Sequence, residues 1–143
     1  AWEIGIPGET LFGPVTANSI PHCAGTNLSG DYTASQDVSL ITPAIQIPAS
    51  GATLTYRQWL DTEGDGDAGA IRILDAGNDN RLLEELVGNI EWNDTAWDNP
   101  PPVTLPNSAS GKLIRLEFRF VSNDSNPESF AGFYLDDIIL QSN

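Results

Sequence analysis

The residues best suited to chemistry lie in the stretch 58–73, where acidic residues alternate with glycines. Three glycines lie among four acids in this stretch: Asp61, Glu63, Asp65, Asp67, Gly64, Gly66 and Gly69. Carboxylates this close repel one another unless water or a cation screens them. Glycines let the backbone turn several oxygens toward one point, and Ca²⁺ takes about six to eight oxygen ligands. The stretch therefore predicts a calcium-binding loop without EF-hand spacing, and the alternative is a solvated hairpin loop.

Asp136 and Asp137 form a second candidate, because they interrupt the apolar run 133–140. Successive side chains of a strand point to opposite faces, so one of the two is expected to point toward the core. A buried carboxylate needs a cation or strong donors. We expect a calcium ion there, shared with Glu3 and oxygens of the loop 25–31; the alternative is that both acids accept backbone N–H bonds. Calcium is favoured over zinc because the candidates are all oxygen ligands. The predicted ligands of the structural Ca²⁺ are Glu3, Asn27, Asp31, Asp61, Glu63, Asp65, Asp67, Asp136 and Asp137.

Cations are scarce: five of the six lie on predicted strands, four of them on the runs 53–60, 70–74 and 113–121. Strand alternation places these four on outward faces, together with one tryptophan and one glutamate. The predicted ligand-binding set on these strands is Arg57, Trp59, Arg72, Arg115, Glu117 and Arg119. If the strands are neighbours, they form a polar face with an aromatic ring, which suits sugar hydroxyls or carboxylates. The alternative is ordinary cross-strand Arg–Glu pairing on a solvated face.

Trp92 is a further ligand-binding candidate, in the long loop 88–112. Glu91, Asn93 and Asp94 beside it offer polar contacts. We expect an exposed aromatic platform here, because an aromatic ring with a polar edge combines stacking with hydrogen bonding.

Catalysis finds little support in the residue types present. His22 is the only histidine, and its neighbour Cys23 points the other way if the chain is extended. There is no HExxH, no GxSxG and no phosphate-binding glycine loop. A pair of carboxylates for glycoside hydrolysis stays open, since acids are plentiful. We expect a module that is not an enzyme.

The elements that must position these residues read as short strands separated by turn residues. Alternating or apolar runs occur at 2–6, 38–47, 53–60, 70–74, 80–87, 103–105, 113–121 and 133–140. The run 80–87 has a short helix as its alternative, and Pro43 breaks the run 38–47. Residues 7–38 read mainly as loop. The pattern predicts an all-β protein, a jelly-roll β-sandwich of two antiparallel sheets, forming one domain over residues 1–143.

The composition of the chain limits the classes of partner that it can bind. The chain has 143 residues, 40% of them hydrophobic, and a formal net charge of -14. Nucleic acids and anionic membranes are therefore not expected as partners. A single cysteine allows no intrachain disulfide, and small secreted domains without disulfides often use a metal instead. No apolar run is long enough for a membrane span and no signal peptide is visible. The chain opens directly on Ala1-Trp2-Glu3-Ile4 and stops just after a strand-like run, so we expect a module cut from a longer protein.

Several segments resemble one family when taken in order. They are WEIGIP at 2–7, CAGTNLSGDY at 23–32, SLITPAIQI at 39–47, TYRQWLDTEGDGDAGAIRI at 55–73, Trp97, IRLEFRFVSND at 114–124 and GFYLDDIIL at 132–140. This order resembles the MAM-like jelly-roll modules of secreted bacterial proteins, a group that includes accessory domains of secreted peptidases and cleaved-adhesin domains of gingipain-type proteases.

The resemblance implies a non-catalytic domain, often stabilised by calcium, attached to a secreted enzyme or adhesin. Its motifs match at Asp61-Thr62-Glu63 with Asp67, at Asp136-Asp137-Ile138 and at Trp2-Glu3; Gly64-Asp65 departs from the commoner Asp-Gly order. Trp97 matches a position that the family places in the core. We therefore predict a secreted or cell-surface module that binds an extracellular carbohydrate or other polymer and contacts neighbouring domains of its parent chain. The alternative is a structural or protein-interaction domain that packs on a secreted peptidase or in a surface assembly.

Overall fold

The computed structural model describes residues 1–8, 11–64, 66–123 and 130–143, and these ranges form ten strands and one short 3-10 helix. The elements are β1 (Glu3–Gly5), β2 (Cys23–Gly25), β3 (Asp37–Ile41), β4 (Ile45–Gln46), β5 (Ala52–Asp61), β6 (Ala68–Asp75), β7 (Arg81–Ile90), β8 (Val103–Thr104), η1 (Asn107–Ala109), β9 (Leu113–Val121) and β10 (Gly132–Ser142). None of the helical structure in the described ranges has the length or hydropathy of a membrane span.

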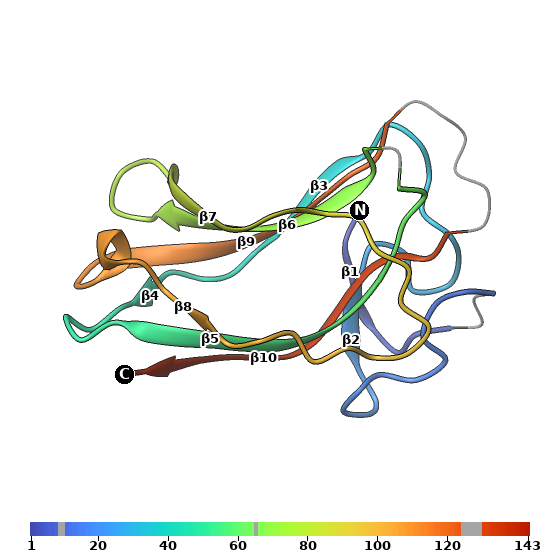
Figure 1. The fold of residues 1–143 in the computed structure, drawn as a ribbon, viewed down its shortest axis with the longest axis horizontal. Helices are drawn as coiled ribbons and strands as arrows, with labels where there is room; N and C mark the ends of the chain where they lie inside the picture. Colours follow the sequence, from blue (N-terminus) through green and yellow to red (C-terminus); the bar gives the residue numbers. More distant parts are fainter. Residues whose placement is uncertain (9–10, 65, 124–129) are drawn as a thin grey trace.

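The strands form two antiparallel sheets that lie face to face (Figure 1). One sheet has the order β1-β2-β10-β5-β8, and the other has the order β3-β9-β6-β7, with β4 also pairing β9. The predicted fold class, an all-β sandwich of two antiparallel sheets, is confirmed. The run 80–87 belongs to β7, which pairs with β6, so the helical alternative for this run is wrong. Proline at position 43 separates β3 from β4, as the sequence predicts.

The core lies between the two sheets and follows the alternation of the strands. In β5 the buried positions include Leu54, Tyr56 and Leu60, each directed into the sandwich. Ile71 and Ile73 of β6 face them from the opposite sheet and are fully buried. Burial of such side chains is the main stabilising contribution to the fold, and it fixes which residues of each strand remain outside.

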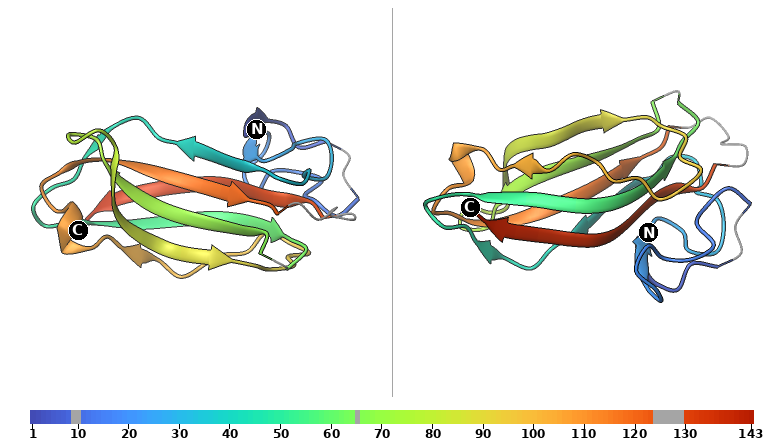
Figure 2. Two further views of the ribbon diagram at one scale, coloured as in Figure 1. Left: turned by 90° about the horizontal axis from the view of Figure 1, so that it is seen from above. Right: turned by 60° about the horizontal axis from the view of Figure 1, so that its bottom comes forward.

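The N-terminal segment adds a lobe beside the first half of β10 (Figure 2). β2 pairs with both β1 and β10, and a second apolar cluster beneath the lobe contains Cys23, Leu28 and Tyr134. The sequence reading missed β2 because all three of its residues are buried and none alternates with an exposed position. The first half of β10 is consequently covered on both faces.

A β-bulge interrupts β10 in the middle of its pairing with β5. Asp136 pairs with Arg57, but the next paired residues are Ile139 and Thr55. Two residues of β10 therefore stand opposite one of β5, and Asp137 adopts a left-handed φ of 48°. Bulges of this kind bend a strand and redirect its side chains, and this bulge places the Asp136–Asp137 pair.

Candidate functional site

Two acids of the stretch 61–67, Asp61 and Asp67, accept hydrogen bonds from the protein. Asp61 ends β5, and its carboxylate accepts bonds from the Asn93 side-chain amide and the backbone N–H of Ala131, each at 3.0 Å. Asp67 is fully buried and accepts bonds from the Tyr32 hydroxyl and from the backbone N–H of Asn123, each at 2.7 Å. Asp65 lies outside the described residues. The carboxylates of Asp61 and Asp67 thus fasten loops to the sandwich.

The same stretch fixes the backbone of Trp92. The backbone N–H of Thr62 donates to the Trp92 carbonyl at 2.9 Å. Leu60 and Asp94 exchange two further bonds at 2.9 Å, one of which the Asp94 carboxylate accepts. Burial, together with Asp98 and Asp61, raises the pKa of the Asp94 carboxyl above its ordinary value even though the Leu60 N–H opposes this shift. The backbone is therefore held, while the Trp92 side chain stays outside, with Trp92 60% exposed.

A pocket of about 440 Å³ lies beside the Trp92 ring, lined by Gly64, Glu91, Trp92 and Asn93. Both amide hydrogens of Asn93 are used, on Asp61 and on the Thr62 carbonyl at 2.9 Å. Glu91 accepts a bond from the backbone N–H of Gly66 at 3.0 Å through one carboxylate oxygen. The pocket consequently offers an aromatic face with acceptor oxygens beside it.

The Tyr134 hydroxyl bonds the backbone of one predicted calcium ligand, Asn27, and is influenced by the charges of three others. That hydroxyl donates to the Asn27 carbonyl, and the Asn27 side chain donates to the Asp31 carbonyl at 3.1 Å. Burial raises the pKa of Tyr134, and the negative charges of Asp31, Glu3 and Asp61 add to this effect. Burial and the Asp61 carboxylate raise the pKa of the Asp31 carboxyl as well. Glu3 accepts a bond from the Leu28 N–H at 2.8 Å.

Asp136 and Asp137 lie at a different place, where they hold the N-terminal lobe. Asp136 accepts a bond from the Ser19 N–H at 2.7 Å, and Asp137 accepts bonds from the Asn18 amide and the Ser19 hydroxyl at 2.7 Å. The expectation that one of the two points into the core is wrong, because the bulge resets the alternation and leaves both half-buried.

Glu3 accepts a bond from the Leu28 backbone, whereas Asp136 and Asp137 accept bonds from Asn18 and Ser19. Among the described residues, no group of three or more His, Cys, Asp or Glu side chains is close enough to hold a metal ion. The calcium site expected from the sequence uses only one of Asp136 and Asp137, together with Glu3 and oxygens of the loop 25–31, and it stays a prediction. Glu63 contributes its backbone N–H, which donates to the Tyr32 hydroxyl at 2.9 Å.

The predicted single polar face is also wrong, because its strands belong to different sheets. Arg57 and Trp59 lie on β5, whereas Arg72, Arg115, Glu117 and Arg119 lie on β6 and β9. On that second sheet Arg72 forms a salt bridge with Glu117 at 3.5 Å. Arg119 forms a bidentate salt bridge with the Asp37 carboxylate, with N–O distances of 2.7 and 2.8 Å. Arg115 donates to the Thr42 carbonyl at 3.1 Å. The alternative of cross-strand pairing describes this face.

The side chain of Trp59 is engaged in contacts within the fold. Its indole N–H donates to the Phe12 carbonyl at 3.2 Å, and its ring packs edge-on against Trp97 at a centroid distance of 6.2 Å. Trp97 in turn donates to the Thr16 carbonyl at 2.9 Å. The two tryptophans hold the N-terminal segment on the outer face of β5, so Trp59 is not an open ligand platform.

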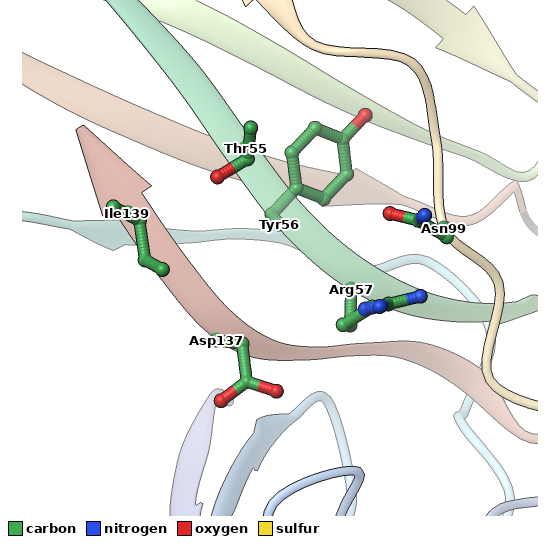
Figure 3. A pocket seen from close by; sticks show the side chains of 6 residues that line it. All are labelled: Thr55, Tyr56, Arg57, Asn99, Asp137 and Ile139. Atoms are coloured by element: carbon green, nitrogen blue, oxygen red, sulfur yellow. The ribbon is translucent and has the colours of Figure 1, made fainter. Parts of the chain in front are cut away.

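A second pocket, of about 290 Å³, lies at the bulge of β10. Figure 3 shows its lining: Thr55, Tyr56, Arg57, Asn99, Asp137 and Ile139. Arg57 is predicted as a sugar-binding residue and Asp137 as a calcium ligand, and nothing in their sequence positions indicates that they lie together. Thr55, Asn99 and Ile139 carry no sequence signal of their own. The two adjacent acids inside an apolar strand were the only trace of the bulge that builds this pocket.

The geometry can be compared with known proteins. The chain is 32% identical over 140 residues to Bacillopeptidase F of Bacillus subtilis (strain 168), an alignment that covers 97% of this chain and 9% of that protein. No family model matches the chain. Two solved structures from Porphyromonas gingivalis W83, both of Lys-gingipain (Kgp), align over 99% of this chain. The K3 cleaved adhesin domain has a TM-score of 0.61 at 19% identity with 91% of that chain covered, and the K1 domain has 0.56 at 21% with 83% covered.

The chain has the fold of the cleaved adhesin domains. The part of the sequence resemblance that named these domains is confirmed at the level of fold, and the MAM-like part stays a prediction. The chain spans about a tenth of the length of Bacillopeptidase F. The similarity therefore lies within one region of a much longer peptidase.

Proposed function

We propose that this chain is a non-catalytic accessory module of a secreted or surface-exposed bacterial protein, and that it binds extracellular carbohydrate at the Trp92 pocket. The exposed Trp92 ring on a fixed backbone carries the proposal. Similarity to one region of a peptidase and to adhesin domains supports an accessory role. Neighbouring domains of the parent chain are partners in the same proposal.

The chemistry of the Trp92 pocket suits a sugar ring. An aromatic face packs on the apolar C–H side of a ring, and such contacts add about 0.5–1.5 kcal/mol beyond area burial. Sugar hydroxyls donate hydrogen bonds, and the pocket offers acceptors: the second carboxylate oxygen of Glu91 and the side-chain carbonyl of Asn93. Because Asp61 and Thr62 hold Asn93 in place, little side-chain entropy is lost on binding.

The proposal gives no catalytic role to the single histidine. His22 is exposed, while the Cys23 thiol beside it is buried. Burial and the Asp136 carboxylate raise the pKa of Cys23 to about 11, so the thiolate is scarce at neutral pH.

The test is affinity electrophoresis of the chain through gels that contain soluble polysaccharides. Trp92→Ala should lower retention about tenfold, while circular dichroism and the melting temperature stay unchanged. Leu82→Ala is the matched control, because Leu82 is an exposed apolar residue on β7 outside the pocket. Equal retention of Trp92→Ala and the unmodified chain would overturn the site.

A protein-interaction role is the second candidate, favoured by the N-terminal lobe. Six large apolar residues are exposed within its first twenty positions: Ile4, Ile6, Leu11, Phe12, Val15 and Ile20. Clustered exposed apolar side chains are typical of interaction surfaces. If no polysaccharide retains the chain, while Ile4→Ser with Ile6→Ser abolishes binding to the adjacent domain of the parent protein, this second function replaces the first.

We also propose a structural Ca²⁺ at the Asp31–Asp61 group. The donor chemistry fits: the Asp31 and Asp61 carboxylates repel each other, the Asn27 side chain bonds the Asp31 carbonyl, and carboxylate and carbonyl oxygens are hard ligands. Backbone carbonyls must complete the set, since no third acid joins it among the described residues. A bound Ca²⁺ supplies positive charge that removes the repulsion between the two carboxylates.

A further inference from the structure

The bulge of β10 opens a polar pocket on the outer face of the first sheet (Figure 3). Its lining comes from three separate segments: β5, β10 and the loop at Asn99. Regular pairing stops after Asp136 and Arg57 and resumes at Ile139 and Thr55. A bulge redirects the side chains of its strand, and the pocket lies where this bulge interrupts the pairing.

Arg57 is the principal donor of this pocket. Its guanidinium has no ion pair or hydrogen bond within the described ranges. In contrast, Arg72 and Arg119 on the opposite sheet are both paired with acids. Figure 3 shows the Arg57 guanidinium directed toward Asn99. A half-buried guanidinium in this state keeps its five N–H donors for a ligand.

Asp137 supplies an acceptor from the neighbouring strand. One of its carboxylate oxygens binds Asn18 and Ser19 of the N-terminal lobe, which fixes the side chain. The other oxygen has no bond within the described part of the chain and remains an acceptor. Thr55 adds a hydroxyl, and Ile139, which is 55% exposed, adds an apolar wall.

Charge decides the class of ligand. The lining carries one guanidinium and one carboxylate, and the chain as a whole carries a formal charge of -14. An acidic polymer is repelled at long range and gains no net charge pairing in the pocket. A hydroxyl both donates and accepts, so adjacent hydroxyls can bind Arg57 and Asp137 together while their C–H face meets Ile139.

We propose that the pocket at the β10 bulge binds a neutral, hydroxyl-rich sugar unit, with Arg57 as donor and Asp137 as acceptor. The proposal rests on the carbohydrate-binding function proposed above and adds a second subsite, which shares no lining residue with the Trp92 pocket. It also sets the specificity of the module, because it selects uncharged over acidic glycans.

Two substitutions test the subsite without removing internal contacts. Arg57→Gln removes a side chain that has no partner in the described structure. Asp137→Asn keeps the left-handed backbone, which asparagine tolerates, and retains an acceptor for Asn18 and Ser19. Arg81→Gln on β7 is the matched control, because it removes the same charge at an exposed position outside the pocket. Thermal melts verify that each variant folds.

The measurement is titration calorimetry with neutral oligosaccharides, such as short β-glucans, and with oligosaccharides of uronic acids. We expect Arg57→Gln and Asp137→Asn each to weaken neutral-sugar binding about tenfold, with Arg81→Gln unchanged and uronic acids bound weakly throughout. If both variants bind like the unmodified chain, or if uronic acids bind more tightly, the subsite is overturned while carbohydrate binding stands. If the unmodified chain binds no neutral sugar, both proposals fall.

Discussion

The hydroxyl of Tyr32 donates a hydrogen bond of 2.7 Å to the Asp67 carboxylate and accepts one of 2.9 Å from the backbone N–H of Glu63. Both residues are deeply buried, with exposures of 3% for Tyr32 and 0% for Asp67. The second oxygen of Asp67 is satisfied by the Asn123 N–H. One phenol thus joins the loop before β3 to the turn between β5 and β6, and hydrogen bonds stabilise this buried carboxylate.

Tyr32→Phe should therefore destabilise the fold. The substitution removes one donor from a buried carboxylate and one acceptor from the Glu63 N–H, which costs about 1–3 kcal/mol of unfolding free energy. Urea denaturation measures the loss. Tyr56→Phe is the control, because Tyr56 is as buried a residue as Tyr32 while its hydroxyl has no hydrogen bond within the described ranges. Equal losses in the two variants would show that the Tyr32–Asp67 bond contributes nothing particular.

Gly25→Ala should be strongly unfavourable. A Cβ at Gly25 would stand 2.6 Å from Cδ1 of Tyr134 and 3.0 Å from Cδ2 of Leu28. The Tyr134 ring is fully buried and tied through its hydroxyl to Asn27, so it has little room to move. Overpacking of this kind costs about 1–3 kcal/mol, measured by urea denaturation.

Gly88→Ala supplies the control for the same change of residue type. Gly88 is also a strand glycine, but apart from its chain neighbours no heavy atom of the described residues lies within 4 Å of its added Cβ. Alanine should leave stability unchanged or raise it slightly, because it reduces the freedom of the unfolded chain. If the Gly25 variant is as stable as the Gly88 variant, the N-terminal lobe can shift around Tyr134 to accommodate the added Cβ without loss of stability.

Local alternation was enough to predict most of the sandwich. Strands β5 and β9 show a clear period of two, and burial follows it in the structure. The sheet that each strand joins was not predictable, because strand pairing depends on contacts far apart in the sequence. For this reason Arg57 and Arg119, both correctly placed on outward faces, belong to opposite sides of the molecule.

The bulge explains the main error at the candidate site. Strict alternation directs Asp136 or Asp137 inward, and nothing in the residue types states that two residues of β10 face one of β5. Once the bulge is known, both acids turn toward Asn18 and Ser19. Trp92, by contrast, was accessible to sequence reasoning, because its polar neighbours and lack of strand pattern already favoured exposure.

The folded state should lose stability at alkaline pH. Burial raises the pKa of Tyr56 to about 12, with a smaller contribution from Asp98, and burial raises that of Cys23 to about 11. Burial also raises the pKa of Tyr32 and Tyr134. Each group binds its proton more tightly when folded, so this stability is complete below about pH 9 and is lost as pH rises through the folded values.

The measurement follows tyrosinate absorbance and circular dichroism together during an alkaline titration. The three tyrosines of the chain should ionise only with the loss of the folded signal, and they should titrate near the ordinary value of about 10 in denaturant. A tyrosine that ionises near pH 10 while the dichroism is intact would contradict the burial described here.

Calcium should stabilise the chain in a pH-dependent way. Burial and the Asp61 carboxylate raise the pKa of Asp31; without metal, the stability linked to its proton is therefore present below about pH 4 and lost as pH rises. A bound Ca²⁺ favours the ionised form and reverses this loss. Added Ca²⁺ should thus raise the melting temperature at pH 7, EDTA should lower it, and the difference should vanish near pH 4.

Asp31→Asn isolates the residue responsible. The variant should lose the calcium response at pH 7 and, in EDTA, be at least as stable as the unmodified chain, because it removes one of two repelling charges. Asp37→Asn is the matched control, since that acid contacts Arg119 on the opposite sheet and should leave the calcium response intact. Identical melting curves of the unmodified chain in EDTA and in Ca²⁺ would remove the structural metal altogether and leave Asp31 as an unfavourably placed acid.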